Sequence, residues 1–381
     1  MYIIIAIIFL FILGFFLAEP SLILNATKEG VSTWYLQVLP ALLPFFIINK
    51  LCCTYGGIDI LGALLRPFTR KVLSLPGESA FVIATGYSTG APVSSSIISS
   101  LRKDGCISKE VGNFLLPFTA NVSPLFIFSV VAASFLLRAD LGIYLAIVHY
   151  GSNIILGIVC LVLFRFKKPP KGISPLTEIK KMREKPIIPL GQGLSAAVLS
   201  GIETIMLIGG LIIVFFILIA ILEYFQIFQI LAYFLRFFGV PTPISLSLFS
   251  GITEITAGTK CTAATNFSIS IKFTVISAIL AFGGISTLCQ IATQIKGTDL
   301  SLKFYLCYKT IQGIFAAIIS KYMPIYEQAI TLPLVKAQGE TWLLLYIPFF
   351  IAFAFWLMLL FIHHHRHLQH RRLKKERSFY R

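Results

Sequence analysis

The sequence predicts an all-α polytopic membrane protein with two inverted repeats, each with an interfacial helix, a re-entrant hairpin and a broken transmembrane helix. Three observations predict this class: the composition, the recurrence of long apolar runs, and a shared order of elements in the two halves. Of the 381 residues, 57% are hydrophobic and 13% are charged, and the mean hydropathy is +0.86. Soluble domains contain about 45–50% apolar and about 25% charged residues, so the composition excludes a soluble enzyme.

The net charge of +16 comes from 32 basic and 16 acidic residues. Most basic residues lie between apolar runs or after the last one, as expected for the cytoplasmic loops of membrane proteins. We therefore attribute the charge to orientation in the bilayer and expect no nucleic-acid partner. The seven cysteines form no CxxC pair, and five of the six histidines lie in the basic tail. This pattern predicts neither a disulfide framework nor a metal site.

The chain begins with apolar runs at residues 2–18 and 31–55. No basic residue precedes the first run, which favours a retained helix over a cleaved signal peptide. Pro40 and Pro44 are expected to bend or unwind the second run. Residues 58–73 alternate apolar and basic positions at helical spacing, which is typical of a helix lying in the membrane interface.

The next two apolar segments are interrupted by polar and small residues. Residues 80–101 contain GYSTGAP, starting at Gly86, and residues 111–137 are split by Asn-Val-Ser-Pro at 121–124. Residues 141–164 then form an uninterrupted run. An apolar helix needs no such cluster, so both interruptions predict broken helices.

The second half repeats this order after a basic linker. It begins with a span at residues 201–224 and an amphipathic piece at 227–238. Two broken segments follow, at 244–270 with GITEITAG and at 273–295 with GGIST. A span at 302–323 and a final apolar run at 342–362 complete it. Glycines 86 and 251 open equivalent interruptions, and each lies 35 residues before the polar centre of the next broken segment, at Asn121 or Ser286. Five elements in one order predict an internal repeat.

A re-entrant hairpin at each first interruption gives every half three membrane crossings, so the second half starts on the opposite face. This threading places 24 of the 32 basic residues on one side and six on the other, in agreement with the positive-inside tendency. Hairpins that spanned fully would also leave the linker and tail on one side, so the charge count supports the inverted arrangement without proving it.

These elements divide the chain into six parts. We expect an N-terminal transmembrane helix at residues 1–30, a first repeat at 31–164 and a basic cytoplasmic linker at 165–200. We expect a second repeat at 201–325, a loop with the last transmembrane helix at 326–362 and a basic tail at 363–381.

The four interruptions supply the candidate functional residues. Broken helices occur at membrane depth where protein or a water-filled cavity satisfies the freed backbone groups, and inverted repeats of this kind are typical of secondary transporters. The candidate substrate-binding residues are Ser88, Thr89, Ser94, Asn121, Ser123, Thr253, Glu254, Thr256, Lys260, Ser286, Thr287 and Gln290. The candidate backbone or hinge positions are Gly86, Gly90, Gly251, Gly258, Gly283 and Gly284.

Glu254 and Lys260 are charges within a membrane segment, where they are costly and usually functional. Two interpretations are open for them. They form a mutual ion pair without contacting a ligand, or Glu254 is protonated and Lys260 neutralises an anionic substrate.

Three motifs connect the sequence to a known family. The segments GYSTGAPVSSS from Gly86, FTANVSPLF from Phe118 and GITEITAGT from Gly251 resemble the YlbJ family of sporulation integral membrane proteins, over roughly residues 30–325. That resemblance implies two nucleoside-recognition (Gate) domains and an architecture related to concentrative nucleoside transporters. It also implies a role in endospore formation, moving dipicolinic acid across the outer forespore membrane. The first interruption has no acidic residue to match Glu254, unlike the paired acids of the nucleoside transporters.

We therefore expect a secondary transporter in the outer forespore membrane or cell membrane, with its linker and C-terminal tail cytoplasmic. Its expected partners are the bilayer, a small anionic substrate and other sporulation membrane proteins. We expect no cofactor, although H⁺ or Na⁺ coupling is open. No enzyme is expected, because the membrane segments show no Asp/His or Cys/His pairing and no phosphate-binding loop. The alternatives are a structural or assembly protein of the sporulation membrane and a nucleoside permease.

Overall fold

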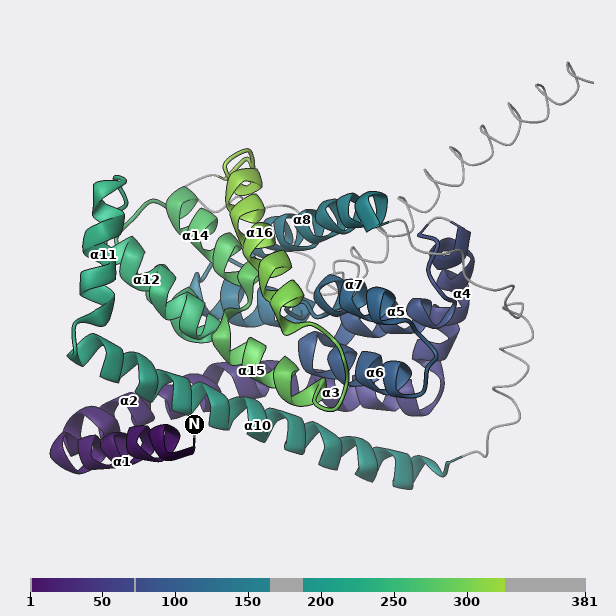
Figure 1. The fold of residues 1–381 in the computed structure, drawn as a ribbon, viewed down its shortest axis with the longest axis horizontal. Helices are drawn as coiled ribbons and strands as arrows, with labels where there is room; N and C mark the ends of the chain where they lie inside the picture. Colours follow the sequence, from purple (N-terminus) through teal and green to yellow (C-terminus); the bar gives the residue numbers. More distant parts are fainter. Residues whose placement is uncertain (1, 72, 165–187, 326–381) are drawn as a thin grey trace, which may run out of the picture.

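A computed structural model describes residues 2–71, 73–164 and 188–325. Within these residues every regular element is a helix, which confirms the predicted all-α class (Figure 1). Among the described residues, five helical stretches are long and apolar enough to cross a membrane: Pro20–Thr54, Leu141–Leu163, Leu190–Tyr224, Ile269–Gln294 and Leu302–Ser320. Most of the predicted linker, the last predicted span and the basic tail lie outside the described residues.

The N-terminal part is more continuous than predicted. Helix α1 (Tyr2–Ala18) is followed by α2 (Pro20–Thr33), the π-helical turn η1 (Trp34–Val38) and α3 (Leu39–Thr54). The boundary expected at residue 30 therefore lies within one long helical stretch. The local unwinding expected at Pro40 is present as the π turn just before it, because proline offers no backbone N–H to the preceding carbonyls.

The first half then contains a helix at the residues predicted for the interfacial one, followed by the two predicted broken helices. Helix α4 (Gly57–Lys71) precedes a pair joined at Gly90, and a second pair is joined at residues 120–123. The elements of these pairs and the span that follows them are α5 (Glu78–Thr89), α6 (Ala91–Lys103), α7 (Lys109–Thr119), η2 (Phe126–Phe135) and α8 (Leu141–Phe164).

The second half shows the same order, which confirms the predicted sequence of elements. It consists of α10 (Leu190–Tyr224), α11 (Ile227–Phe237), α12 (Thr242–Thr253), α13 (Ile255–Ala264), α14 (Ile269–Phe282), α15 (Gly284–Gln294) and α16 (Leu302–Ser320). Helix α10 begins at Leu190, within the residues assigned to the linker, and lies along α2 and α3 (Figure 1). The inverted orientation of the two halves stays a prediction.

Glycine has two different uses at the interruptions. Gly90 and Gly283 form breaks with φ of 88° and 89°, which favours glycine because it lacks a Cβ. Gly86 and Gly251 do not open the breaks as expected, since both lie inside helices. They allow close packing instead: a Cβ on Gly86 would lie 2.6 Å from the carbonyl oxygen of Thr119.

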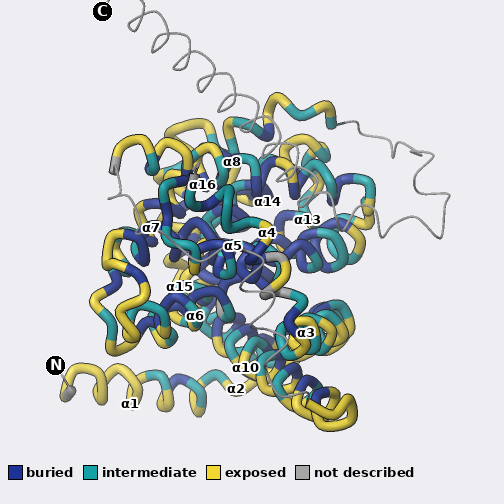
Figure 2. The backbone as a smooth tube through the Cα atoms, turned by 90° about the vertical axis from the view of Figure 1, so that its right-hand side faces the viewer, coloured by how far each residue is buried: buried dark blue, intermediate teal, exposed yellow. Residues whose placement is uncertain are grey.

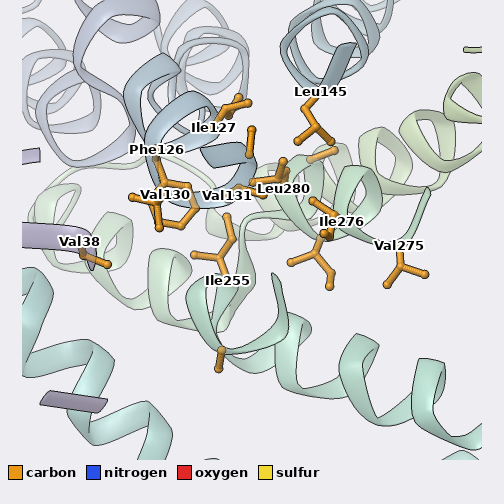
Figure 3. Packing of buried hydrophobic residues seen from close by; sticks show 14 of the residues in the cluster. Val38, Phe126, Ile127, Val130, Val131, Leu145, Ile255, Val275, Ile276 and Leu280 are labelled. Atoms are coloured by element: carbon orange, nitrogen blue, oxygen red, sulfur yellow. The ribbon is translucent and has the colours of Figure 1, made fainter. Parts of the chain in front are cut away.

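The core and the outer surface are both apolar. Figure 3 shows Ile127 and Val130 of η2 and Ile276 and Leu280 of α14, which belong to one cluster of buried residues. Helix α1 is exposed along most of its length (Figure 2). Helices α10 and α11 also carry exposed large apolar side chains, such as Phe237, which is 87% exposed. Apolar side chains outside as well as inside are what a lipid environment requires, so the fold is that of an integral membrane protein.

Candidate functional site

A cavity of about 110 Å³ lies where the four helix breaks meet. The breaks contribute Gly90, Asn121, Thr256 and Gly283 to its wall. Helices α3, α10 and α16 close the rest of the wall. Segments that are far apart in the sequence, and that come from both halves, therefore form one site.

The structure brings many of the candidate residues to this cavity. Those that line it are Thr89, Gly90, Asn121, Ser123, Thr256, Gly283, Thr287 and Gln290. Those that do not are Ser88, Ser94, Thr253, Glu254, Lys260, Ser286, Gly86, Gly251, Gly258 and Gly284.

Ser88, Ser94 and Thr253, which lie outside the cavity, have local structural partners. Ser88 Oγ donates to the Ala84 carbonyl at 2.8 Å, and Thr253 Oγ1 donates to the Phe249 carbonyl at 2.8 Å. Serine and threonine side chains commonly bond back to the preceding turn in this way. Serines and threonines near a break therefore indicate which segment is broken, but they do not indicate which side of that segment faces the cavity.

Glu254 caps a helix. It is 2% exposed. Its Oε2 accepts the Ala257 N–H at 2.7 Å, and its Oε1 accepts the Thr256 hydroxyl at 3.2 Å. A carboxylate at this position satisfies N–H groups that the first turn of α13 leaves free. The side chain thus holds Thr256, which does line the cavity.

Lys260 points away from the cavity and does not pair with Glu254. Its Nζ lies 3.1 Å from Glu29 Oε1 and donates to Thr33 Oγ1 at 2.9 Å, so it connects α13 to α2. The same ammonium lies 6.0 Å from the ring centre of Phe216. The mutual ion pair, one of the two open interpretations, is therefore not formed, and Lys260 does not line the cavity.

Lys309 is the cation that lines the cavity, and it was not among the candidates. It lies on α16 and is 2% exposed. Its Nζ donates to Asn121 Oδ1 and to Gln312 Oε1, both at 2.9 Å. An ammonium has three donors, and the described residues place no carboxylate within ion-pair distance of it. The available signal was a lysine inside an otherwise apolar predicted span.

Asn153 is a second residue that sequence reasoning missed. Its Nδ2 donates to the Phe118 carbonyl at 2.6 Å, and Asn121 Nδ2 donates to the same oxygen at 2.9 Å. Tyr308 in turn donates to Asn153 Oδ1 at 2.9 Å. These bonds satisfy the carbonyl freed at the first-half break and fix the amide that accepts from Lys309.

The four half-helices that start at the cavity differ in how they are capped. Ser123 accepts the Phe126 N–H at 3.3 Å at the start of η2, and Glu254 caps α13. Helices α6 and α15 start at Gly90 and Gly283, and neither has a side-chain cap. Free N–H groups at a helix start attract anions, so the cavity offers two such ends beside the Lys309 ammonium.

Known proteins resemble this chain in sequence and in fold. No family model matches the chain. It is 34% identical over 330 residues to the sporulation integral membrane protein YlbJ of Bacillus subtilis (strain 168), covering 82% of this chain and 80% of that protein.

Solved structures show the same fold. The chain is similar to the concentrative nucleoside transporter CNTnw in an inward-facing substrate-bound state, with a TM-score of 0.50, 11% identity and coverage of 81% of this chain and 86% of that one. An intermediate state of a CNTnw variant has a TM-score of 0.51 and 13% identity, with coverage of 82% of this chain and 87% of that one. By its sequence relationship, the chain belongs to the YlbJ family of sporulation integral membrane proteins.

Proposed function

We propose that this protein is a secondary transporter of endospore formation that moves dipicolinate across the outer forespore membrane by alternating access. Dipicolinate is a planar pyridine with two carboxylates. One observation carries the proposal: four helix breaks from two halves converge on a cavity that contains a buried ammonium, to which the described residues offer no carboxylate partner. The proposal assigns transport and no enzymatic reaction to that cavity.

The charge of Lys309 is the argument for an anionic substrate. Burying an ammonium costs several kcal/mol unless an opposite charge compensates it. Its two partners, Asn121 and Gln312, are neutral amides. A substrate carboxylate at about 4 Å would contribute about 4 kcal/mol at an effective dielectric constant of 20. The third N–H of the ammonium is available for that contact.

Another part of the cavity wall suits a second carboxylate. The first turn of α15, which follows Gly283, has no side-chain cap, and Thr287 and Gln290 of the same helix line the cavity wall. Val38 and Leu42 provide an apolar wall for a flat ring. We therefore place one substrate carboxylate at Lys309 and the other at the start of α15.

The small size of the cavity agrees with a site that opens and closes during transport. Ligand pockets usually measure about 300–1,000 Å³, and this one measures about 110 Å³. A dicarboxylate fits after the half-helices separate slightly, which alternating access requires in any case. We propose that the two halves are inverted repeats, with linker and tail cytoplasmic, and that other sporulation membrane proteins are partners.

A nucleoside permease is the second candidate, and the fold of CNTnw supports it. The charges of the cavity favour the anion. Among the described residues no aspartate or glutamate lines the cavity, and a neutral nucleoside would leave the Lys309 ammonium uncompensated. A purely structural role in membrane assembly would not require polar residues at all four breaks.

Uptake into proteoliposomes tests the proposal. We expect the purified protein to take up labelled dipicolinate, with competition from other aromatic dicarboxylates and little competition from uridine or a neutral pyridine carboxamide. Empty liposomes provide the background. Uptake of uridine without uptake of dipicolinate would establish the permease instead, and uptake of neither would support the assembly role.

A further inference from the structure

His149 is a buried titratable side chain that the proposed transport cycle does not yet use. It lies on α8 and is 0% exposed. Neither of its ring nitrogens has a hydrogen-bond partner within the described part of the chain. Buried polar atoms are normally hydrogen-bonded, so two free nitrogens on one ring call for an explanation. Imidazole is also the side chain that gains and loses a proton near neutral pH.

Gln312 connects His149 to the cavity. Its Nε2 donates to the His149 carbonyl at 3.1 Å, and its Oε1 accepts from Lys309 at 2.9 Å. His149 and Lys309 thereby lie on the packed helices α8 and α16 and share Gln312 as a neighbour. Charges in a buried environment interact strongly, so the anion that compensates Lys309 also changes the proton affinity of the ring.

The other elements packed against α8 contribute few competing charges. These elements are α7, η2, α14 and α16, and η2 contains no titratable side chain. The titratable residues of the other three are Lys109, Glu110, Lys272, Lys303, Tyr305, Cys307, Tyr308 and Lys309. Lys272 donates to the Ala263 carbonyl, and Tyr308 donates to Asn153. On α8 itself the nearest such group is Tyr150, whose ring centre lies 4.9 Å from that of His149 and whose hydroxyl donates to Val122.

We propose that His149 is a proton-binding site linked to the anion site, so that the protein takes up a proton together with its dicarboxylate. This inference rests on the proposed function. In the empty site, the Lys309 ammonium disfavours a second cation on the imidazole. A carboxylate bound at Lys309 cancels that repulsion, and one ring nitrogen of His149 then binds a proton taken up from the aqueous phase on the side where the anion enters. The proton leaves again when the carboxylate leaves on the other side of the membrane.

The linkage is reciprocal. Anion binding favours protonation of His149, and protonation favours anion binding by the same factor. Couplings of this kind typically amount to about 5- to 150-fold. Between about pH 8 and about pH 6 the substrate carboxylates stay ionised, since ordinary carboxyl groups titrate near pH 4. Any tightening of dipicolinate binding over that range therefore comes from the protein.

Calorimetry on the unmodified protein tests the linkage without a variant. Dipicolinate binding is measured at about pH 7 in two buffers of different ionisation enthalpy, which reports the protons taken up per anion bound. We expect net proton uptake. Zero uptake or proton release would overturn the inference while leaving the dipicolinate site intact. An absence of dipicolinate binding would overturn the proposed function and this inference together.

A pair of variants assigns the proton to His149. His149→Gln removes the titratable ring, and Ser152→Ala is the matched control because Ser152 Oγ donates to the His149 carbonyl at 2.9 Å and is equally buried. In proteoliposomes we expect His149→Gln to keep dipicolinate exchange but to lose accumulation driven by a pH gradient, whereas Ser152→Ala keeps both. Gradient-driven accumulation by His149→Gln at the wild-type level would contradict the assignment.

Discussion

Replacing Lys309 with methionine isolates the charge of the cavity. Methionine keeps most of the length and volume of the side chain and removes the ammonium. The lost contact is a hydrogen bond between an ammonium and a carboxylate, worth about 1.5–3 kcal/mol, together with the longer-range attraction of a buried charge. A total of about 3 kcal/mol corresponds to an approximately 100-fold weaker Kd for dipicolinate.

The stability of the variant separates a binding role from a structural one. The substitution removes the unfavourable burial of an ammonium. It also leaves Asn121 Oδ1 and Gln312 Oε1 without the donor that they have in the wild type, at a cost of about 1–3 kcal/mol for each unsatisfied group. These effects oppose each other, so the midpoint of thermal unfolding in detergent should change little.

The assay is equilibrium binding of labelled dipicolinate and of a neutral pyridine carboxamide to both proteins. We expect a large loss of affinity for the dianion and a small change for the neutral compound. Lys309→Arg should recover part of the affinity, because it keeps the charge but has a larger, planar head group. Unchanged dipicolinate affinity in a folded Lys309→Met protein would refute the placement of the anion at α16.

Three further predictions address other parts of the site. Gly90→Val should abolish dipicolinate uptake without preventing membrane insertion, because Gly90 has φ of 88° and a Cβ there would lie 3.0 Å from the Asn121 carbonyl oxygen. The control is Gly210→Val on α10, where no atom lies within 4 Å of the added Cβ. Equal uptake by both variants would contradict the role of the break. Lys260→Met should leave dipicolinate affinity within about twofold of wild type and lower the unfolding midpoint slightly, since an exposed ion pair contributes about 0–1 kcal/mol; a large loss of affinity would return Lys260 to the site. The Arg102 guanidinium, 2.8 Å away, lowers the pKa of Asp299. The stabilisation by this pair is therefore present above the ordinary aspartate pKa and is lost as pH falls through the lowered pKa. The unfolding midpoints of wild type and Asp299→Asn should converge in acid, and a constant difference would argue against the pair.

Local sequence patterns predicted the elements well. A broken helix needs residues that tolerate or stabilise a break, and those residues are visible as Gly-rich or Asn-Ser-Pro clusters. The span at Leu141–Phe164 was predicted with its observed ends, and each half contains the two broken helices that were predicted for it. The position of a break within its cluster was less accessible. Gly86 and Gly90 look alike in sequence, but only the position with a left-handed φ is the break, and the other glycine is explained by its contact with Thr119.

The site could be predicted only in part, because it depends on how distant helices dock. The sequence shows that Thr253 and Thr256 lie in one interruption, but not which of them faces the cavity. Lys260 and Lys309 are both lysines in apolar segments. What distinguishes them is tertiary: Lys260 reaches Glu29 on α2, whereas Lys309 meets Asn121 from a break 188 residues earlier in the chain.

The most direct test of the central claim is a structure of the protein determined with dipicolinate bound. The account predicts density for the ligand in the cavity between the four breaks, with one carboxylate within about 3 Å of Lys309 Nζ and the other at the N–H groups that start α15. Density for dipicolinate elsewhere, or a cavity that remains empty at saturating dipicolinate, would contradict it.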